Sequence, residues 1–155
     1  MQLTQYTDYT LRVLMYLAQT PDRNVTITEM ANFYQISRNH LVKVIHSLVK
    51  QGTLMSIRGK HGGVRLALLP ETIKIGTLIR QTENHFSLVE CMHSNVQAHE
   101  NCTLLRQCGL KPMFGQALRA FFEVLDQYTL ADALKSTAFP TNMIHVVFSH
   151  HVGVK

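Results

Sequence analysis

The three cysteines of this 155-residue chain are the residues best suited to chemistry, because they all lie between positions 91 and 108. Ten residues separate Cys91 from Cys102, and five separate Cys102 from Cys108. Three thiolates on one segment can converge on a soft metal, and iron–sulfur clusters and zinc are the usual candidates. The spacing does not choose between them. Both kinds of site normally take four ligands, so the fourth must come from elsewhere in the chain, from a second subunit or from an exchangeable ligand.

The composition is that of a folded domain, with 46% hydrophobic and 16% charged residues. The length fits one domain, or a small domain with an interaction element. No apolar run reaches the roughly 18 residues of a membrane span, and the N-terminus lacks a signal-peptide pattern. We therefore expect a cytoplasmic protein. Thiols stay reduced in that compartment, so an odd number of cysteines favours metal binding or redox sensing over disulfides.

The positive charge lies in the first half of the chain. Residues 1–80 hold ten Lys and Arg against four Asp and Glu, whereas residues 81–155 hold five against six. The net charges of the two parts are thus +6 and −1. Such asymmetry indicates contact with a polyanion, most often nucleic acid.

The segment YTDYTLRVLMYLAQTP predicts a buried helix that ends before Pro21, since its apolar residues recur at helical spacing. Asp8 lies in the first turn, where a carboxylate complements the helix dipole, and Arg12 follows at i+4. An i,i+4 ion pair is the simplest role for Asp8. The apolar residues are Tyr9, Val13, Leu14, Met15, Tyr16 and Leu17.

The next segment has the pattern of a helix-turn-helix. Thr26–Glu29 reads as a capping box that opens a helix through about Phe33. Residues 34–36 form a short turn, and Ser37 caps a third helix that stops at Gly52. An apolar stripe on the third helix leaves a polar and basic face toward solvent. The residues of that face are Arg38, Asn39, His40, Lys43 and Ser47.

A β-hairpin is predicted directly after the third helix. Leu54–Ile57 and Val64–Leu68 are strand-like runs, and the glycine-rich RGKHGG joins them. Arg58, Lys60 and Arg65 lie at its tip. A basic hairpin after a helix-turn-helix is a wing, which can reach phosphates or the minor groove, so the first half of the chain is predicted to bind DNA.

Beyond the wing the sequence predicts helices. ETIKIGTLIRQTE (71–83) should be a fourth helix, and Pro112 suits the N1 position of a long one. The long helix carries an apolar stripe broader than one small domain needs, so packing against its copy in a second subunit would give a twofold dimer. Thr129–Asp132 starts a further helix to about Leu134. The stripe consists of Phe114, Leu118, Phe121, Phe122 and Leu125.

The predicted fold is therefore mainly α: a winged helix-turn-helix with a long C-terminal dimerisation helix and a small β-hairpin wing. We divide the chain into a DNA-binding domain (1–83), a cysteine-containing cluster-binding loop (84–111), the dimerisation helix with the following short helix (112–135) and a C-terminal tail (136–155). The tail has no functional interpretation.

Residues 1–135 resemble the IscR/NsrR family of iron–sulfur winged-helix repressors, and most closely its NsrR-type, nitric-oxide-sensing members. The resemblance rests on MQLTQYTDYTLRVLMYLA, SRNHLVKVIHSLVKQG, RGKHGGVRLA, SLVEC with the two later cysteines, and LDQYTLADAL. Together these segments are highly specific, although the cysteine loop alone is not.

The resemblance implies a homodimeric repressor that binds palindromic operator DNA while a cluster, usually [4Fe-4S], is intact. Cys91, Cys102 and Cys108 match the family's three cysteine ligands. Asp8 matches the fourth, an aspartate in the first helix of the other subunit. IscR-type members instead have a histidine three residues after the last cysteine. Lys111 stands there in this chain, so the IscR-type site is not available.

The gap between Cys91 and Cys102 is longer than is usual in the family. A longer loop costs little closure entropy, about 0.6 kcal/mol for a doubling, so we retain Cys91 as a ligand. His93 and His99 lie within the enlarged gap and could offer an alternative ligand.

The sequence thus predicts a repressor that releases DNA when nitric oxide attacks its cluster, and not an enzyme. We expect Arg38, Asn39 and His40 to read bases, with Ser37 at the start of the same helix. Lys43, Arg58, Lys60 and Arg65 should contact phosphates or the minor groove. The alternative is a zinc- or thiol-based redox regulator on the same fold, without an iron–sulfur cluster. For the cofactor itself, the alternatives to [4Fe-4S] are [2Fe-2S] and zinc. A cysteine-nucleophile enzyme has no supporting base or oxyanion arrangement.

Overall fold

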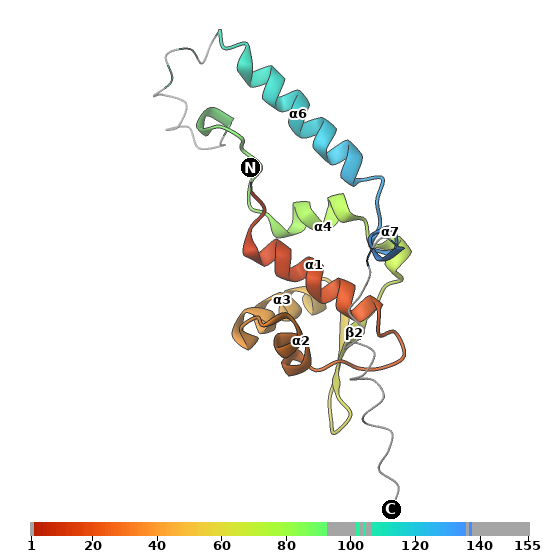
Figure 1. Cartoon of the computed structure of the whole chain (residues 1–155). Helices are drawn as coiled ribbons and strands as arrows, with labels where there is room; N and C mark the ends of the chain where they lie inside the picture. The colour runs from red at the N-terminus through yellow and green to blue at the C-terminus, as the bar shows by residue number, and fades with distance from the viewer. Residues whose placement is uncertain (1, 93–101, 103, 105–106, 136, 138–155) are drawn as a thin grey trace, which may run out of the picture.

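The computed structural model describes residues 2–92, 102, 104, 107–135 and 137. The fold is mainly helical with one two-stranded sheet, which confirms the predicted class (Figure 1). The elements in chain order are α1 (Gln5–Ala18), α2 (Ile27–Tyr34), α3 (Arg38–Lys50), β1 (Leu54–Ile57), β2 (Gly63–Leu66), the 3-10 turn η1 (Pro70–Thr72), α4 (Ile75–Thr82), the 3-10 turn η2 (Glu90–Met92), α6 (Leu110–Leu125) and α7 (Leu130–Lys135).

Helix α1 is central and packs against α3, β2, α4 and α7. The Thr4 side chain caps it by accepting the Thr7 N–H at 3.3 Å. Its apolar face is buried as predicted, but Thr7 and Thr10 are fully buried too, whereas Tyr9 is only half-buried. Thr10 satisfies its hydroxyl within the helix by donating to the carbonyl of Tyr6 at 2.8 Å.

Helices α2 and α3 form the predicted helix-turn-helix. The Thr26 hydroxyl accepts the Glu29 N–H at 3.2 Å, which is one half of the predicted capping box. The tight turn is made at Gln35, a non-glycine residue in the left-handed region (φ 54°). The apolar stripe of α3 is buried in the common core, and it consists of Leu41, Val44, Ile45 and Leu48.

The Glu29 side chain does not complete the capping box at the start of α2. It bonds instead to residues outside α2 and so connects this helix to α1. It accepts a hydrogen bond from the Tyr16 hydroxyl at 2.7 Å and forms an ion pair with Arg23. Partial burial opposes its ionisation, but the hydrogen bonds from Arg23 and Tyr16 lower the pKa of Glu29 below its ordinary value. The charge therefore remains paired at the base of the helix-turn-helix.

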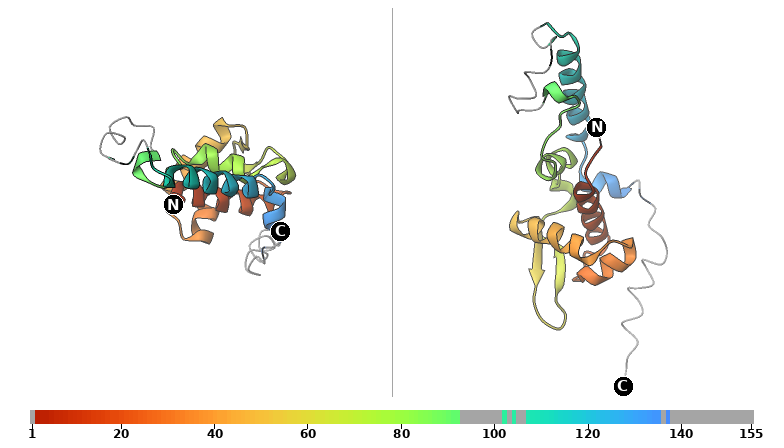
Figure 2. Two further views of the ribbon diagram at one scale, coloured as in Figure 1. Left: turned by 90° about the horizontal axis from the view of Figure 1, so that it is seen from above. Right: turned by 90° about the vertical axis from the view of Figure 1, so that its left-hand side faces the viewer.

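The wing is an antiparallel hairpin in which Leu54 pairs with Leu66 and Ile57 with Gly63. Figure 2 shows it projecting beyond the helices. Val25, from the loop before α2, forms a bridge with Val64 through reciprocal backbone hydrogen bonds of 2.9 and 2.8 Å. A Cβ at position 63 would lie 2.6 Å from the Val25 carbonyl oxygen, so glycine is required for this approach.

The fourth helix begins later than predicted. Residues 70–72 form the 3-10 turn η1, and α4 starts only at Ile75. Ile73 is extended and buried, and its carbonyl accepts the Leu130 N–H at 2.9 Å. Because the Ile75 N–H also donates to Tyr128, at 3.0 Å, the backbone pairs with a distant segment where a continuous helix would have run.

Helix α6 runs away from the winged-helix body and meets it at its C-terminal end (Figure 1). It begins at Leu110, so Pro112 occupies the third helical position instead of the predicted first, where it still displaces no intrahelical donor. Phe122 is buried within the chain against Phe86, edge to face at 4.6 Å. The predicted apolar stripe of this helix is therefore partly covered by the chain itself.

Helix α7 starts where predicted, with reciprocal bonds between Thr129 and Asp132. The Thr129 N–H donates to Asp132 at 3.0 Å, and the Asp132 N–H donates to the Thr129 hydroxyl at 3.3 Å. No helix in the described part of the chain is both long enough and apolar enough to span a membrane.

Candidate nucleic-acid interface and metal centre

The polar start of α3 is exposed as predicted. Ser37, Arg38, Asn39 and Lys43 all face solvent, whereas the opposite side of the helix is buried. Ser37 occupies the N-cap position but makes no side-chain capping bond, so its hydroxyl remains available to a partner. This turn also presents the first backbone N–H groups of a helix, which attract phosphate oxygens.

His40 is exposed on the same turn, but it is held by a neighbouring helix. Its ring stacks on Tyr9 of α1, with the ring centroids 6.0 Å apart and the planes 26° from parallel. No such ring contact holds the other two predicted base readers, Arg38 and Asn39, because neither side chain is aromatic. We infer that the orientation of His40 is set before any partner arrives.

The wing tip carries the predicted cations. Arg58, Lys60 and Arg65 are exposed, and Arg65 donates to the Met55 sulfur at 3.0 Å across the hairpin. Neither Arg58 nor Lys60 takes part in an ion pair within the described part of the chain. Unpaired cations on a projecting hairpin are free to contact phosphates.

Asn24 is a residue of this surface that the sequence analysis missed. Its amide donates to the His61 carbonyl at 3.0 Å and so fixes the wing tip to the loop before α2. Arg23 and Val25 anchor the same loop on either side. No local pattern marks Asn24, because its partner lies 37 residues away and the contact exists only once the hairpin folds back.

The three cysteines are free thiols of intermediate exposure. Cys91 lies in η2, and Cys108 comes just before Gly109, the N-cap of α6. Among the described residues, no group of three or more His, Cys, Asp or Glu side chains could hold a metal ion, so one chain alone does not bring the predicted ligands together. The predicted alternative ligands His93 and His99 lie outside the described residues.

Asp8 has the predicted ion pair with Arg12, at 3.0 Å, and its side chain is 47% exposed. Arg12 in turn lies 5.8 Å from the ring centre of Tyr34, whose hydroxyl donates to the Arg12 carbonyl at 3.0 Å. Burial raises the pKa of Tyr34 to about 12, so this hydroxyl keeps its proton at neutral pH. The first turns of α1 are thereby linked to the end of α2.

Glu83 fastens the N-terminus of α1 to the end of α4. One oxygen of its carboxylate accepts the Thr4 N–H at 2.7 Å, the Thr4 hydroxyl at 2.9 Å and the Thr7 hydroxyl at 2.5 Å. Partial burial opposes ionisation, but these bonds hold the pKa of Glu83 below its ordinary value. Glu83, where the segment that leads to the cysteines begins, is thus fixed beside the first turn of α1, which carries Asp8. From the sequence alone, Glu83 is predicted only as the last residue of a helix.

Helices α2 and α3 and the basic wing together form a winged helix-turn-helix. This fold defines a class of DNA-binding transcription regulators, which are not enzymes. Residues 3–136 match the family model Rrf2, described as an iron-dependent transcriptional regulator. The chain therefore belongs to the Rrf2 family of transcriptional regulators.

Curated relatives and solved structures agree with this assignment. The chain is 49% identical to the HTH-type transcriptional regulator NsrR of Bacillus licheniformis over 86% of the chain and 92% of the relative. It is 46% identical to NsrR of Bacillus subtilis over 88% and 92%. The structure of IscR from T. potens matches with a TM-score of 0.68 and 26% identity, covering 92% and 96%. CymR, the global cysteine regulator of B. subtilis, matches with a TM-score of 0.69 and 25% identity, covering 89% and 99%.

Proposed function

We propose that two copies of this chain form a repressor that binds palindromic operator DNA with an iron–sulfur cluster in place and releases it when nitric oxide reacts with the cluster. The observation that carries the proposal is the set of three free, partly exposed cysteines between α4 and α6 in a member of a family of iron-dependent regulators. The sequence resemblance to nitric-oxide-sensing members of the family supports the signal, and the NsrR relatives of this chain are transcriptional regulators. The unpaired cations of α3 and the wing support DNA binding.

The donor chemistry fits an iron–sulfur cluster. Cys91, Cys102 and Cys108 supply three soft thiolates, and none of them is in a disulfide. We assign the fourth ligand to the partner subunit's Asp8, which would have to exchange its Arg12 partner for the metal. When bound, the cluster supplies iron that reacts with nitric oxide. Asp8 would be a harder donor than the thiolates, so its bond to the iron would be the weakest of the four. We propose that the cluster is of the [4Fe-4S] type.

The dimer is proposed to form through the exposed apolar face of α6. Leu110, Met113 and Val124 on this face are 59%, 64% and 52% exposed, and Ala117 and Ala120 lie between them. Their spacing of three and four residues is that of a coiled-coil seam. On the opposite face, the C-terminal end of α6 packs on its own chain through Phe122. An apolar helix face that its own chain leaves exposed is normally covered by a partner. A second copy of α6, related by a twofold axis, would cover the seam.

The chain's own residues provide a route from the metal site to DNA. Asp8 lies one residue after Thr7, and Glu83 ties Thr7 to the start of the segment that leads to the cysteines. Tyr9 follows Asp8 and stacks on His40 at the start of α3. Loss of the bond to the partner subunit's Asp8 would loosen the two subunits. The recognition helices must enter successive major grooves about 34 Å apart, so a small rotation would lower operator affinity.

The test of the proposal is made on anaerobically purified protein. We expect brown protein with bound iron and sulfide, visible absorption that nitric oxide bleaches, and operator binding that falls in step with the bleaching in a fluorescence anisotropy titration. Colourless protein with stoichiometric zinc would instead establish the zinc-based alternative. Operator binding that is unaffected by nitric oxide would exclude the proposed signal.

Replacing Lys60 by alanine should weaken binding to all DNA sequences about equally, because an unpaired cation on the wing contributes through phosphates. The slope of log K against log salt should become shallower by about 1. Lys135→Ala is the matched control, since that lysine lies on α7 in a surface pair with Asp132 and should leave the slope unchanged. A loss confined to one base pair of the operator would assign Lys60 to base reading.

A further inference from the structure

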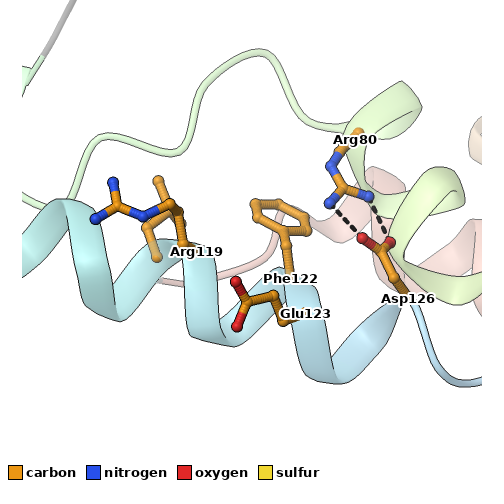
Figure 3. A pocket seen from close by; sticks show the side chains of 6 residues that line it. Arg80, Arg119, Phe122, Glu123 and Asp126 are labelled. Carbon is orange, nitrogen blue, oxygen red and sulfur yellow. Dashed lines mark hydrogen bonds and ion pairs between the residues drawn. The ribbon is translucent and has the colours of Figure 1, made fainter.

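The C-terminal end of α6 is joined to α4 by a paired arginine and aspartate. The two terminal nitrogens of Arg80 donate to the two carboxylate oxygens of Asp126 at 2.6 and 2.7 Å (Figure 3). The same guanidinium lies 4.1 Å from the ring centre of Phe122, one turn earlier on α6. A planar fork that binds a carboxylate through two bonds and stacks on a ring fixes orientation as well as distance.

The backbone of α4 approaches this pair closely at Gly76. A Cβ at Gly76 would lie only 2.0 Å from the Asp126 carboxylate, so any larger residue would displace the pair. Just beyond, the Ile75 N–H donates to the Tyr128 carbonyl at 3.0 Å, and the Leu130 N–H donates to the Ile73 carbonyl at 2.9 Å. The end of α6 is therefore held at a fixed place on the start of α4.

Among the described residues, α6 packs on α4 at this junction. Phe122 lies under the Arg80 guanidinium and makes a T-shaped contact with the Phe86 ring. The rest of α6 extends away from the helices of the body (Figure 1). A helix held near one end changes direction easily if that hold loosens, and its far end then moves most.

Stability alone does not explain the pair. The Arg80 and Asp126 side chains are 41% and 45% exposed, and ion pairs at that exposure contribute little to the free energy of folding. The hydrogen bonds from Arg80 nevertheless hold the pKa of Asp126 below its ordinary value, so the pair is ionised at neutral pH. The two parallel hydrogen bonds and the stacked ring instead fix the orientation of the end of α6 relative to α4.

We propose that Arg80 and Asp126 are positioning residues that set the angle between α6 and the winged-helix body, and thereby the separation of the two recognition helices. This inference rests on the proposed dimeric DNA binding through α6. The wing and the free end of α6 lie at opposite ends of the molecule (Figure 1). A change of angle at the junction is consequently converted into a displacement of each recognition helix along the DNA.

The experiment measures tolerance to operator spacing. An inverted repeat is selected from random DNA by the wild-type protein, and variants with one base pair inserted or removed at its centre are prepared. Each change moves the half-sites by about 3.4 Å and turns them by about 35°. We expect the wild-type protein to bind the altered spacings at least tenfold more weakly. Arg80→Lys and Asp126→Asn should each reduce that discrimination at least threefold, with dimer mass and visible spectrum retained.

Two further measurements make the result decisive. The double variant should be no worse than either single one, because the two side chains act as a unit. Arg119→Lys is the matched control, since Arg119 lines the same surface pocket of about 300 Å³ but has no ion-pair partner among the described residues. An equal loss of affinity at every spacing, or an unchanged spacing preference, would overturn the inference. A wild-type protein that is monomeric and indifferent to spacing would overturn the proposed function itself, and this inference with it.

Discussion

Replacing Cys108 by alanine should abolish the visible absorption of anaerobically purified protein and weaken operator binding at least tenfold. A cluster site built from three thiolates and one carboxylate loses a strong ligand in this variant, and the remaining donors include only two thiolates. Cys108 also stands immediately before the N-cap of α6, so its bond would connect the metal directly to the dimerisation helix. Iron and sulfide quantitation, with anisotropy on the selected inverted repeat, measures both effects.

Asp8→Ala should have a smaller effect on the cluster than Cys108→Ala. Loss of the carboxylate should leave the cluster formed but more labile, or change its response to nitric oxide, because the three thiolates remain. Asp22→Ala is a matched control, since Asp22 is an exposed aspartate that belongs to no proposed site. If Cys108→Ala retained full iron content, Cys108 would be no ligand. An Asp8→Ala protein with an unchanged spectrum and response would reduce Asp8 to a partner of Arg12.

The parts of the fold that local chemistry determines were predicted from the sequence. The capping threonine at position 26, the short turn at 34–36 and the apolar stripe of α3 are all short-range features, and they placed the helix-turn-helix within a residue or two. The wing followed from two strand-like runs around a glycine-rich turn. The exposed cations of α3 and the wing were found because a basic face opposite a buried stripe is visible in the residue order itself.

The features that the sequence analysis missed all depend on residues far apart in the chain. The late start of α4 results from backbone bonds to Tyr128 and Leu130, more than fifty residues away. Thr7 is buried although it is polar, because Glu83 accepts its hydroxyl hydrogen across 76 residues. These contacts exist only after α1, α4 and α6 have packed together. The hydrogen bond from Asn24 to the His61 carbonyl in the wing is likewise a contact between residues far apart in the chain.

Helix α6 shows why an apolar pattern alone does not identify an interface. Phe114, Leu118, Phe121, Phe122 and Leu125 have helical spacing, and the sequence analysis assigned them to a second subunit. Phe122 is 9% exposed within one chain, under Arg80 and Phe86. The other four are half-buried, and their contact with a second subunit stays a prediction. The side chains that the chain leaves most exposed lie on another face, at Leu110, Met113 and Val124. Periodicity finds an apolar helix, but only the packing decides which face is left for a partner.

That remaining face leads to the prediction with the largest expected effect. Ala117→Glu places a carboxylate at the centre of the proposed seam, where two small alanines allow close approach of the helices. Burying that charge against a copy of itself has no compensating partner, so the dimer should dissociate. A monomer engages one half-site instead of two, and affinity for the inverted repeat should fall at least about a hundredfold. Sedimentation velocity measures the dissociation, and anisotropy measures the loss of binding.

Gln116→Glu is the matched control, because it adds the same carboxylate to the same helix about 100° round its surface. Gln116 is exposed and lies outside the seam, so this variant should remain dimeric and bind the operator as the wild-type protein does. Affinity for an isolated half-site should be nearly equal in Ala117→Glu and wild type, since neither α3 nor the wing is altered. A dimeric Ala117→Glu protein would show that the subunits meet elsewhere. A monomer that kept full operator affinity would show that DNA binding needs no second subunit.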